Sequence, residues 1–136
     1  MSYGVSAALQ TAIFGALQAD GALGALVGGA IFDAAPVGAV PSTYVTLGPE
    51  AVRDRSDASG PGAQHDFTVS VVTDVAGFQT AKAIAAAVSD VLLGAPLTVS
   101  RGRVVGVWFR RAQARRVERS TVRRIDMTFR ARVEDQ

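Results

Sequence analysis

The amino-acid sequence predicts a single α+β domain over residues 1–136, with a mostly antiparallel sheet and two main helices packed on one of its faces. A chain of 136 residues has the length of one domain. Apolar residues recur at helical spacing in two segments, and strand-forming residues cluster between turn signals in others. The segments follow one another as helix, short helix, two strands, helix and three strands, which favours antiparallel pairing.

Helices are expected where apolar residues recur every three or four positions. The first covers residues 5–19, which carry no charge but are interrupted by polar side chains, so it is interpreted as an amphipathic helix and not as a membrane span. Asp20 can cap a short second helix over residues 22–27, which Gly28 ends in a left-handed conformation. The third helix begins near Ala76. Its buried stripe is expected to comprise Phe78, Ala81, Ala85, Val88 and Leu92.

Strands are expected over residues 43–47, 66–73, 97–100, 104–114 and 121–133, and a brief extended piece over residues 30–32. The last strand has the clearest alternation. One of its faces carries the apolar residues Ile125, Met127, Phe129, Ala131 and Val133. The other face carries Arg124, Asp126, Thr128, Arg130 and Arg132. This pattern predicts one core face and one face that is either wet or part of an interface.

The strand before it is interpreted in the same way. Its core-facing residues are expected to be Val105, Val107 and Phe109. Trp108 then lies on the opposite face with Arg110, where it either covers a small apolar cluster or anchors a subunit interface, in which Trp and Arg are enriched. Residues 115–120 are the expected tip of a basic hairpin.

Residues 48–64 are expected to form a long mobile loop, because Gly, Pro, Ser and charged residues dominate them. Such a loop is either an arm that contacts a partner or a flexible connection without a binding role. Its acidic and basic residues alternate and are interpreted as solvated charge; they are Glu50, Arg53, Asp54, Arg55 and Asp57. His65, at the end of the loop, is interpreted as a solvated or capping side chain.

Charge is divided unevenly along the chain. Residues 1–99 hold three basic against eight acidic residues, for a net charge of −5, and residues 100–136 hold eleven arginines against four acidic residues, for +7. This polarity suits contact between copies of the chain or with an acidic partner, and it also attracts nucleic-acid phosphates. A basic edge strand that is merely protected from aggregation explains it equally well.

The sequence is poor in catalytic groups. It has one His, no Cys, and no sequence pattern of a serine hydrolase, a zinc protease or a phosphate-binding loop. We therefore predict no enzyme activity, no cofactor and no metal site. The function is expected to reside in an interface, for which the candidates are Arg53, Arg55, Trp108, Arg110, Arg115, Arg116, Arg119, Arg124, Arg130 and Arg132.

Nearly the whole chain, over residues 5–133, resembles a small family of siphophage proteins. The segments that carry the likeness are SAALQTAIFGALQADGALGALVGGAIFDAAP, STYVTLG, AKAIAAAVSDVLLGAPLTV, RVVGVWF and the final Arg-rich strand. The family comprises the tail terminators, also called tail completion proteins, with homologues in gene transfer agents. The likeness lies in the order and general composition of the segments, and no individual site residue is assigned from it.

The resemblance implies a structural virion protein without an active site. Members form a hexameric ring at the head-proximal end of the tail tube, stop its polymerisation and meet the head connector. The implied partners are further copies, the tail tube protein and the connector or stopper protein, with DNA passing through the lumen and no membrane involved. The implied location is the virion neck, after assembly in the host cytoplasm. A head-completion connector and a small basic DNA-binding module are the alternatives.

Overall fold

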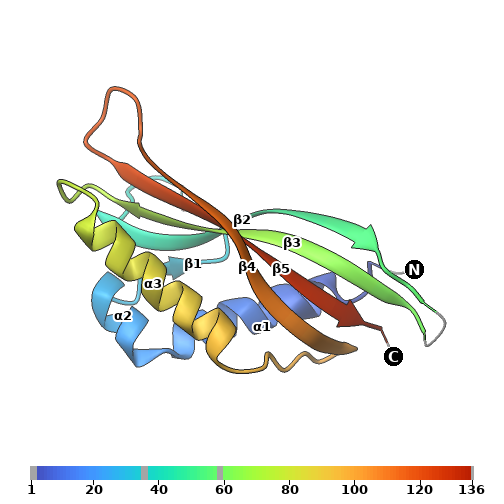
Figure 1. Ribbon diagram of the computed structural model, residues 1–136. Helices are drawn as coiled ribbons and strands as arrows, with labels where there is room; N and C mark the ends of the chain where they lie inside the picture. Colours follow the sequence, from blue (N-terminus) through green and yellow to red (C-terminus); the bar gives the residue numbers. More distant parts are fainter. Residues whose placement is uncertain (1–2, 35–36, 58–59, 136) are drawn as a thin grey trace.

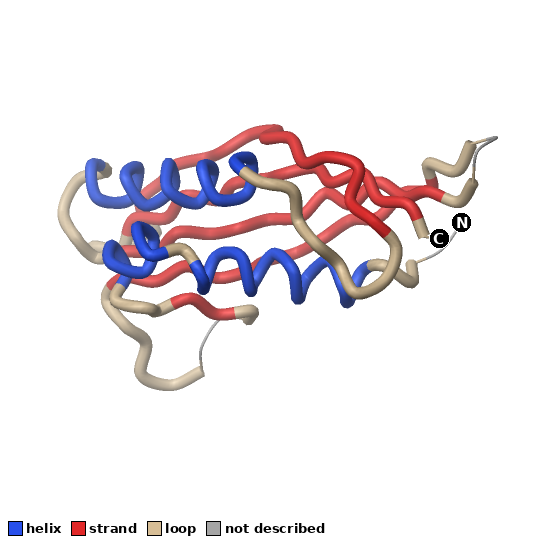
Figure 2. Tube along the Cα trace, turned by 90° about the horizontal axis from the view of Figure 1, so that it is seen from below, coloured by secondary structure: helices blue, strands red, loops and turns tan. Residues whose placement is uncertain are grey.

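The computed structural model describes residues 3–34, 37–57 and 60–135, and it confirms the predicted α+β class. In this part of the chain, five strands form one sheet and three helices lie on one of its faces (Figures 1 and 2). The helices are α1 (Ser6–Ala19), α2 (Gly21–Val27) and α3 (Gln79–Gly94). The strands are β1 (Ile31–Phe32), β2 (Thr43–Asp54), β3 (Gly62–Thr73), β4 (Arg103–Arg116) and β5 (Arg123–Glu134).

The sheet has the order β1-β2-β3-β5-β4, and its four long strands alternate in direction. The short β1 runs parallel to β2, where Ile31 pairs with Val45 and Phe32 with Thr46. Beyond these two pairs, β2 has a strand on one side only within the described chain. β4 forms the opposite edge of the sheet.

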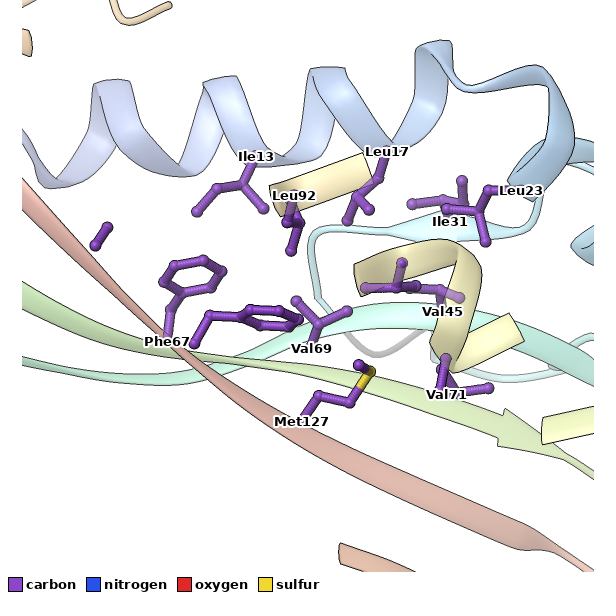
Figure 3. Packing of buried hydrophobic residues seen from close by; sticks show 14 of the residues in the cluster. Ile13, Leu17, Leu23, Ile31, Val45, Phe67, Val69, Val71, Leu92 and Met127 are labelled. Carbon is purple, nitrogen blue, oxygen red and sulfur yellow. The ribbon is translucent and has the colours of Figure 1, made fainter. Parts of the chain in front are cut away.

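The core lies between the sheet and the helices. Of the stripe expected on the third helix, Ala81, Ala85, Val88 and Leu92 are buried, but α3 begins at Gln79, so Phe78 precedes the helix and lies outside the buried cluster. Figure 3 shows Ile13 and Leu17 of α1 and Leu92 of α3 facing side chains of the sheet. The main buried residues of the long strands are Val45, Phe67, Val69, Val71, Ile125, Met127 and Phe129. Phe129 is fully buried, and its ring stacks against Phe67 with the ring centroids 5.6 Å apart.

Both ends of α2 form as predicted. The Oδ2 atom of Asp20 accepts a hydrogen bond of 2.9 Å from the backbone N–H of Leu23, which satisfies a donor of the first turn. Gly28 ends the helix with φ at 62°, a conformation that disfavours side chains with a Cβ atom. α2 therefore turns the chain from α1 to the edge of the sheet.

The expectation of a long mobile loop over residues 48–64 is wrong. β2 continues to Asp54 and β3 begins at Gly62, so the two strands form a long hairpin that projects from one end of the sheet (Figure 1). An irregularity in the pairing between Leu47 and Glu50 breaks the alternation of polar and apolar residues. The edge position of β2 also leaves polar side chains exposed, which is why this strand looks like a loop in the sequence.

The C-terminal hairpin is close to the prediction. Residues 117–122 form the turn between β4 and β5, and it projects from the end of the sheet opposite to the β2–β3 turn (Figure 1). The strand expected over residues 97–100 is absent from the structure, which shows an irregular segment there. Leu97 makes no strand pairing, but its side chain is buried and anchors this connection in the core.

The alternation expected in β4 is only partly present. Irregularities in its pairing with β5 lie between Val104 and Gly106 and between Phe109 and Arg111. Each bulge shifts which residues face the helices, so Val105 is 47% exposed and not core-facing as predicted. Val107 packs against the core as predicted, and Phe109, although 45% exposed, meets the ring of Phe129 edge to face.

Candidate assembly surface

The second face of the sheet carries no helix within the described residues (Figure 2). It presents the alternate residues of β5 that the sequence assigns to it, and all of them are half-buried: Arg124, Asp126, Thr128, Arg130 and Arg132. Half-burial of long basic side chains indicates that they lie along the sheet instead of extending into water. Their partners on the neighbouring strands explain this arrangement.

Arg130 is held by Asp66, which lies directly opposite on β3. Its Nε atom donates to Oδ1 at 2.8 Å, and its Nη2 atom donates to Oδ2 at 3.2 Å. The hydrogen bond from Arg130 is the main reason why the pKa of Asp66 lies below its ordinary value. The side chains are 29% and 27% exposed, so this pair contributes on the order of 1 kcal/mol or less to stability.

Arg124 belongs to a second cross-strand cluster. Its Nε atom donates to Oδ1 of Asp126 at 2.8 Å, and its Nη2 atom donates to the hydroxyl of Ser70 at 3.2 Å. Ser70 in turn donates to Asp126 at 2.6 Å. Arg115 approaches the same carboxylate from β4, with 3.9 Å between Nε and Oδ2. The cluster links β3, β5 and β4 across the sheet.

Arg132 is bound to the turn of the β2–β3 hairpin. Its Nη2 atom donates to the backbone carbonyl of Arg55 at 2.9 Å and lies 3.4 Å from Oδ2 of Asp57. The Nε atom of Arg55 donates to Oε1 of Gln64 at 3.3 Å. These contacts fix a segment that the sequence analysis treats as mobile, and they keep Arg132 within its own subunit.

The structure therefore divides the predicted interface residues into two groups. Arg124, Arg130 and Arg132 have acidic partners on their own subunit, which lowers the net charge that they offer to another molecule. Sequence reasoning missed Asp66 and Ser70 as partners, because the register of two strands far apart in the chain is not visible in the sequence. The alternation of β3 predicts on which face of the sheet Asp66 and Ser70 lie, but not which residues of β5 lie opposite them.

The remaining predicted residues lie at the edges and tips of the sheet. Arg116 and Arg119 are exposed, at the end of β4 and in the β4–β5 turn, and Arg53 is exposed on β2. These three make no ion pair with a described residue. Arg110 lies in the second bulge of β4, where its charge helps to lower the pKa of Asp66. Arg111, which the prediction omits, is exposed beside it and also lacks an ion pair within the described chain.

Apolar side chains accompany these arginines on β4. Trp108 is 50% exposed, and a Cβ atom on Gly106 would lie 2.9 Å from its ring, so the indole covers this glycine. Val105 and Phe109 are also exposed on β4, with Phe109 on the face opposite to Trp108, and these three residues are together called the apolar strip of this edge. A groove of about 230 Å³ lies alongside, between β4 and the end of α3, and Leu93 and Pro96 contribute to its lining. Trp beside Arg at an exposed edge is the composition of a protein interface.

A buried polar network forms around His65, where the sequence predicts a solvated or capping side chain. This prediction is wrong, because His65 is fully buried in β3. Its Nδ1 atom lies 3.2 Å from Oε2 of Glu50 on β2, while Oε1 of Glu50 accepts hydrogen bonds of 2.6 Å from the hydroxyls of Tyr3 and Ser6. The extension of β2 brings Glu50 opposite β3, and the network joins the start of α1 to the hairpin.

This network does not form a nucleophilic triad, because Ser6 donates to Glu50 and not to His65. Within residues 3–34, 37–57 and 60–135, no group of three or more His, Asp or Glu side chains is arranged to hold a metal ion. None of the described helices is long and apolar enough to cross a membrane. The prominent surface feature is the β4 edge with its apolar strip and unpaired arginines.

Comparison with known proteins identifies the family. The model of the family described as tail completion protein gp17 matches residues 11–134. The chain belongs to this family. A search of curated proteins returned no match. Among solved structures, a chain from the virion of a native gene transfer agent (GTA) particle is 62% identical, with a TM-score of 0.91 over 98% of this chain and 99% of that one.

Membership of the tail completion family confirms the resemblance inferred from the sequence. The match begins within α1 and ends in β5, so it includes both hairpins and the β4 edge. The high identity and coverage show that a chain of a GTA virion shares this fold along nearly its whole length.

Proposed function

We propose that this chain is a structural virion subunit that forms a ring at the head-proximal end of a phage-like tail tube. There it ends tube polymerisation and joins the tail to the head connector. Membership of the tail completion family carries this proposal, and the likeness to a chain of a GTA virion supports it. The subunit then lies at the neck of the particle, after assembly in the host cytoplasm.

The distribution of charge supports contact between unlike surfaces of neighbouring copies. The first 99 residues have a net charge of −5 and the remainder +7. Ion pairs between the two parts cancel some of this difference, whereas Arg110, Arg111 and Arg116 on β4 make no ion pair with a described residue and remain available to an acidic neighbour. Contacts between unlike surfaces close into a ring when the rotation between copies allows it. The sequence resemblance implies six copies, which makes hexameric closure the specific expectation.

In this proposal the chain acts through assembly, without catalysis. Its one His is buried in a network that ties α1 to a hairpin, and the slot beside Glu50 of that network has a volume of only about 20 Å³. Three of the four arginines of β5, Arg124, Arg130 and Arg132, are half-buried and have acidic partners, which weakens the alternative of a DNA-binding module.

Electron microscopy of tail tubes mixed with the purified protein tests the proposal. We expect a ring at one end of each tube and a halt in tube growth. A head-completion connector would instead bind the head portal and leave the tubes open, so it gives a distinct result. Tight binding to duplex DNA that falls steeply with salt, without any effect on tubes, would show a DNA-binding module.

A further inference from the structure

Both long edges of the sheet are open. β4 pairs with β5 on one side, and its other side has no strand or backbone hydrogen bond from any described segment. β2 is covered by β1 only at Val45 and Thr46, so residues 50–54 are equally open and exposed for most of their length. An open edge strand is a template for pairing with another chain.

The directions of the strands make these two edges compatible. β2, β3, β5 and β4 alternate in direction, and their number is even, so β2 and β4 run in opposite directions. If a neighbouring copy is related by rotation about an axis roughly parallel to the strands, its strands keep the same directions as those of the first copy. Its β2 would therefore run antiparallel to β4 of the first copy and continue the pattern of the sheet.

Charge favours this arrangement over pairing of β4 with the β4 strand of another copy. β4 carries five arginines and no acidic residue, and only Arg103 and Arg115 have acidic partners, on β5, so two copies of β4 side by side would bring together six arginines without an acidic partner. Like charges on adjacent strands oppose pairing. The open segment of β2 carries Glu50, Arg53 and Asp54, with a net charge of −1, and it suits a basic neighbour better.

The shape of the two edges agrees with the same pairing. Pro49 has no backbone N–H, and it lies in the bulge of β2 just before the open segment, so pairing begins at Glu50. On β4, the strip of Val105, Trp108 and Phe109 is exposed in the single subunit. A strand laid along this edge removes part of that strip from water, which adds apolar burial to the backbone hydrogen bonds.

We propose that β4 of one copy pairs antiparallel with residues 50–54 of β2 in the next copy, so that the sheets join into one continuous wall around the ring. The inference rests on the proposed function, because it requires copies related by rotation. The partner is a second copy of this chain, presented through its open β2 edge. The basic strand and the apolar strip on β4 are then parts of one contact.

Site-directed cysteines test this pairing, since the chain has no native cysteine. Ala51→Cys places a thiol on the outer face of β2, because Ala51 pairs with Asp66 on that face. Trp108→Cys, Arg111→Cys and Gln113→Cys place one on the outer face of β4, within and beside the apolar strip. The Ala51 variant is mixed in turn with each β4 variant and with tail tubes, oxidised, and resolved on a non-reducing gel. Ala112→Cys, on the inner face of β4, is the matched control.

We expect a disulfide-linked dimer in at least one of the three mixtures, and none with the Ala112 variant, because thiols on opposite faces cannot reach bonding distance. Neither partner alone should form a dimer. Dimers of a β4 variant by itself would show β4–β4 pairing and overturn the inference. Rings on the tubes without any dimer also overturn it while the proposed function stands. If the unmodified protein forms no rings, the proposed function fails, and this inference with it.

Discussion

The imidazole of His65 and the carboxylate of Glu50 form a buried contact, with 3.2 Å between Nδ1 and Oε2. Glu50 also accepts hydrogen bonds from Tyr3 and Ser6, so one carboxylate joins the start of α1 to both strands of the β2–β3 hairpin. Nε2 of His65 is buried without a hydrogen-bond partner among the described groups. An ionised carboxylate can only accept hydrogen bonds, so Nδ1 of His65 is the donor in this contact.

Replacement of Glu50 by Gln should destabilise the fold. The substitution keeps the shape but removes the charge to which the two hydroxyls and His65 bind, and hydrogen bonds to a charged group contribute about 1.5–3 kcal/mol. We expect a loss of about 1–3 kcal/mol in the free energy of unfolding, measured by urea denaturation. Arg53→Gln on the same strand, where the side chain is exposed, is the control and should change stability by about 0.5 kcal/mol or less. Equal effects of both variants would rule out a structural role for the network.

The lowered pKa of the Glu50 carboxylate predicts that the stability of the fold depends on pH. Burial alone raises the pKa of Glu50, but hydrogen bonds from Ser6, Tyr3 and His65 outweigh it and hold the pKa below its ordinary value. A carboxylate with a lowered pKa in the folded state stabilises the fold above the pKa of the unfolded chain, about 4.3 for Glu. This contribution is lost as pH falls through the lower folded-state pKa.

Urea denaturation between pH 7 and pH 3 measures this contribution. We expect the stability of the wild-type chain to fall more steeply below about pH 5 than that of Glu50→Gln, because the variant lacks this titrating group. The pKa of Asp66 is also lowered, by Arg130, and Asp66 contributes equally to the pH dependence of stability in both proteins. Parallel pH profiles of the two proteins would contradict the assignment of Glu50.

Much of the fold could be predicted because its signals are local. The apolar spacing of α1 and α3, the cap at Asp20 and the alternation in β5 each lie within one segment, and the structure confirms them. The extent of β2 was not predictable, because the bulge after Leu47 disrupts the alternation that reveals a strand. A bulge in β4 likewise turned Val105 out of the core.

The candidate surface was predicted in composition but not in its internal pairing. Alternation in β5 placed Arg124 and Arg130 on the correct face. Whether each arginine is open to another molecule depends on the strand register, which sets Asp66 opposite Arg130 across 64 positions of sequence. Such pairing belongs to the tertiary structure, so the sequence could not separate the paired arginines from the unpaired ones on β4.

Two glycines should respond in opposite directions to replacement by Ala. Gly102 has φ at 68°, and a Cβ atom there would clash with the backbone carbonyl of Glu134, so we expect a loss of about 1–2 kcal/mol or more. Gly15 lies in α1, has no atom within 4 Å of such a Cβ, and is exposed. Its replacement should gain about 0.5–1 kcal/mol from helix propensity. Thermal denaturation of both variants checks this, and a stable Gly102→Ala would refute the strain.

The arginines of β4 should matter more for assembly than those of β5. The double variant Arg111→Ser, Arg116→Ser removes two charges without an acidic partner, so the folded monomer should keep its stability within about 0.5 kcal/mol. Because these side chains are free to meet an acidic neighbour, we expect ring formation on tail tubes to fall at least about tenfold, as loss of about 1.4 kcal/mol of contact energy implies. The number of capped tubes seen by electron microscopy measures this effect.

Two comparisons make that experiment decisive. Lys82→Ser removes one positive charge from the exposed surface of α3 and should leave capping unchanged. Arg130→Ser removes a paired arginine, so its main effect should be on stability, at up to about 1 kcal/mol, with capping retained at protein concentrations where the variant is folded. If Arg130→Ser abolished capping while the β4 variant did not, the paired face of the sheet and not its edge would be the contact surface.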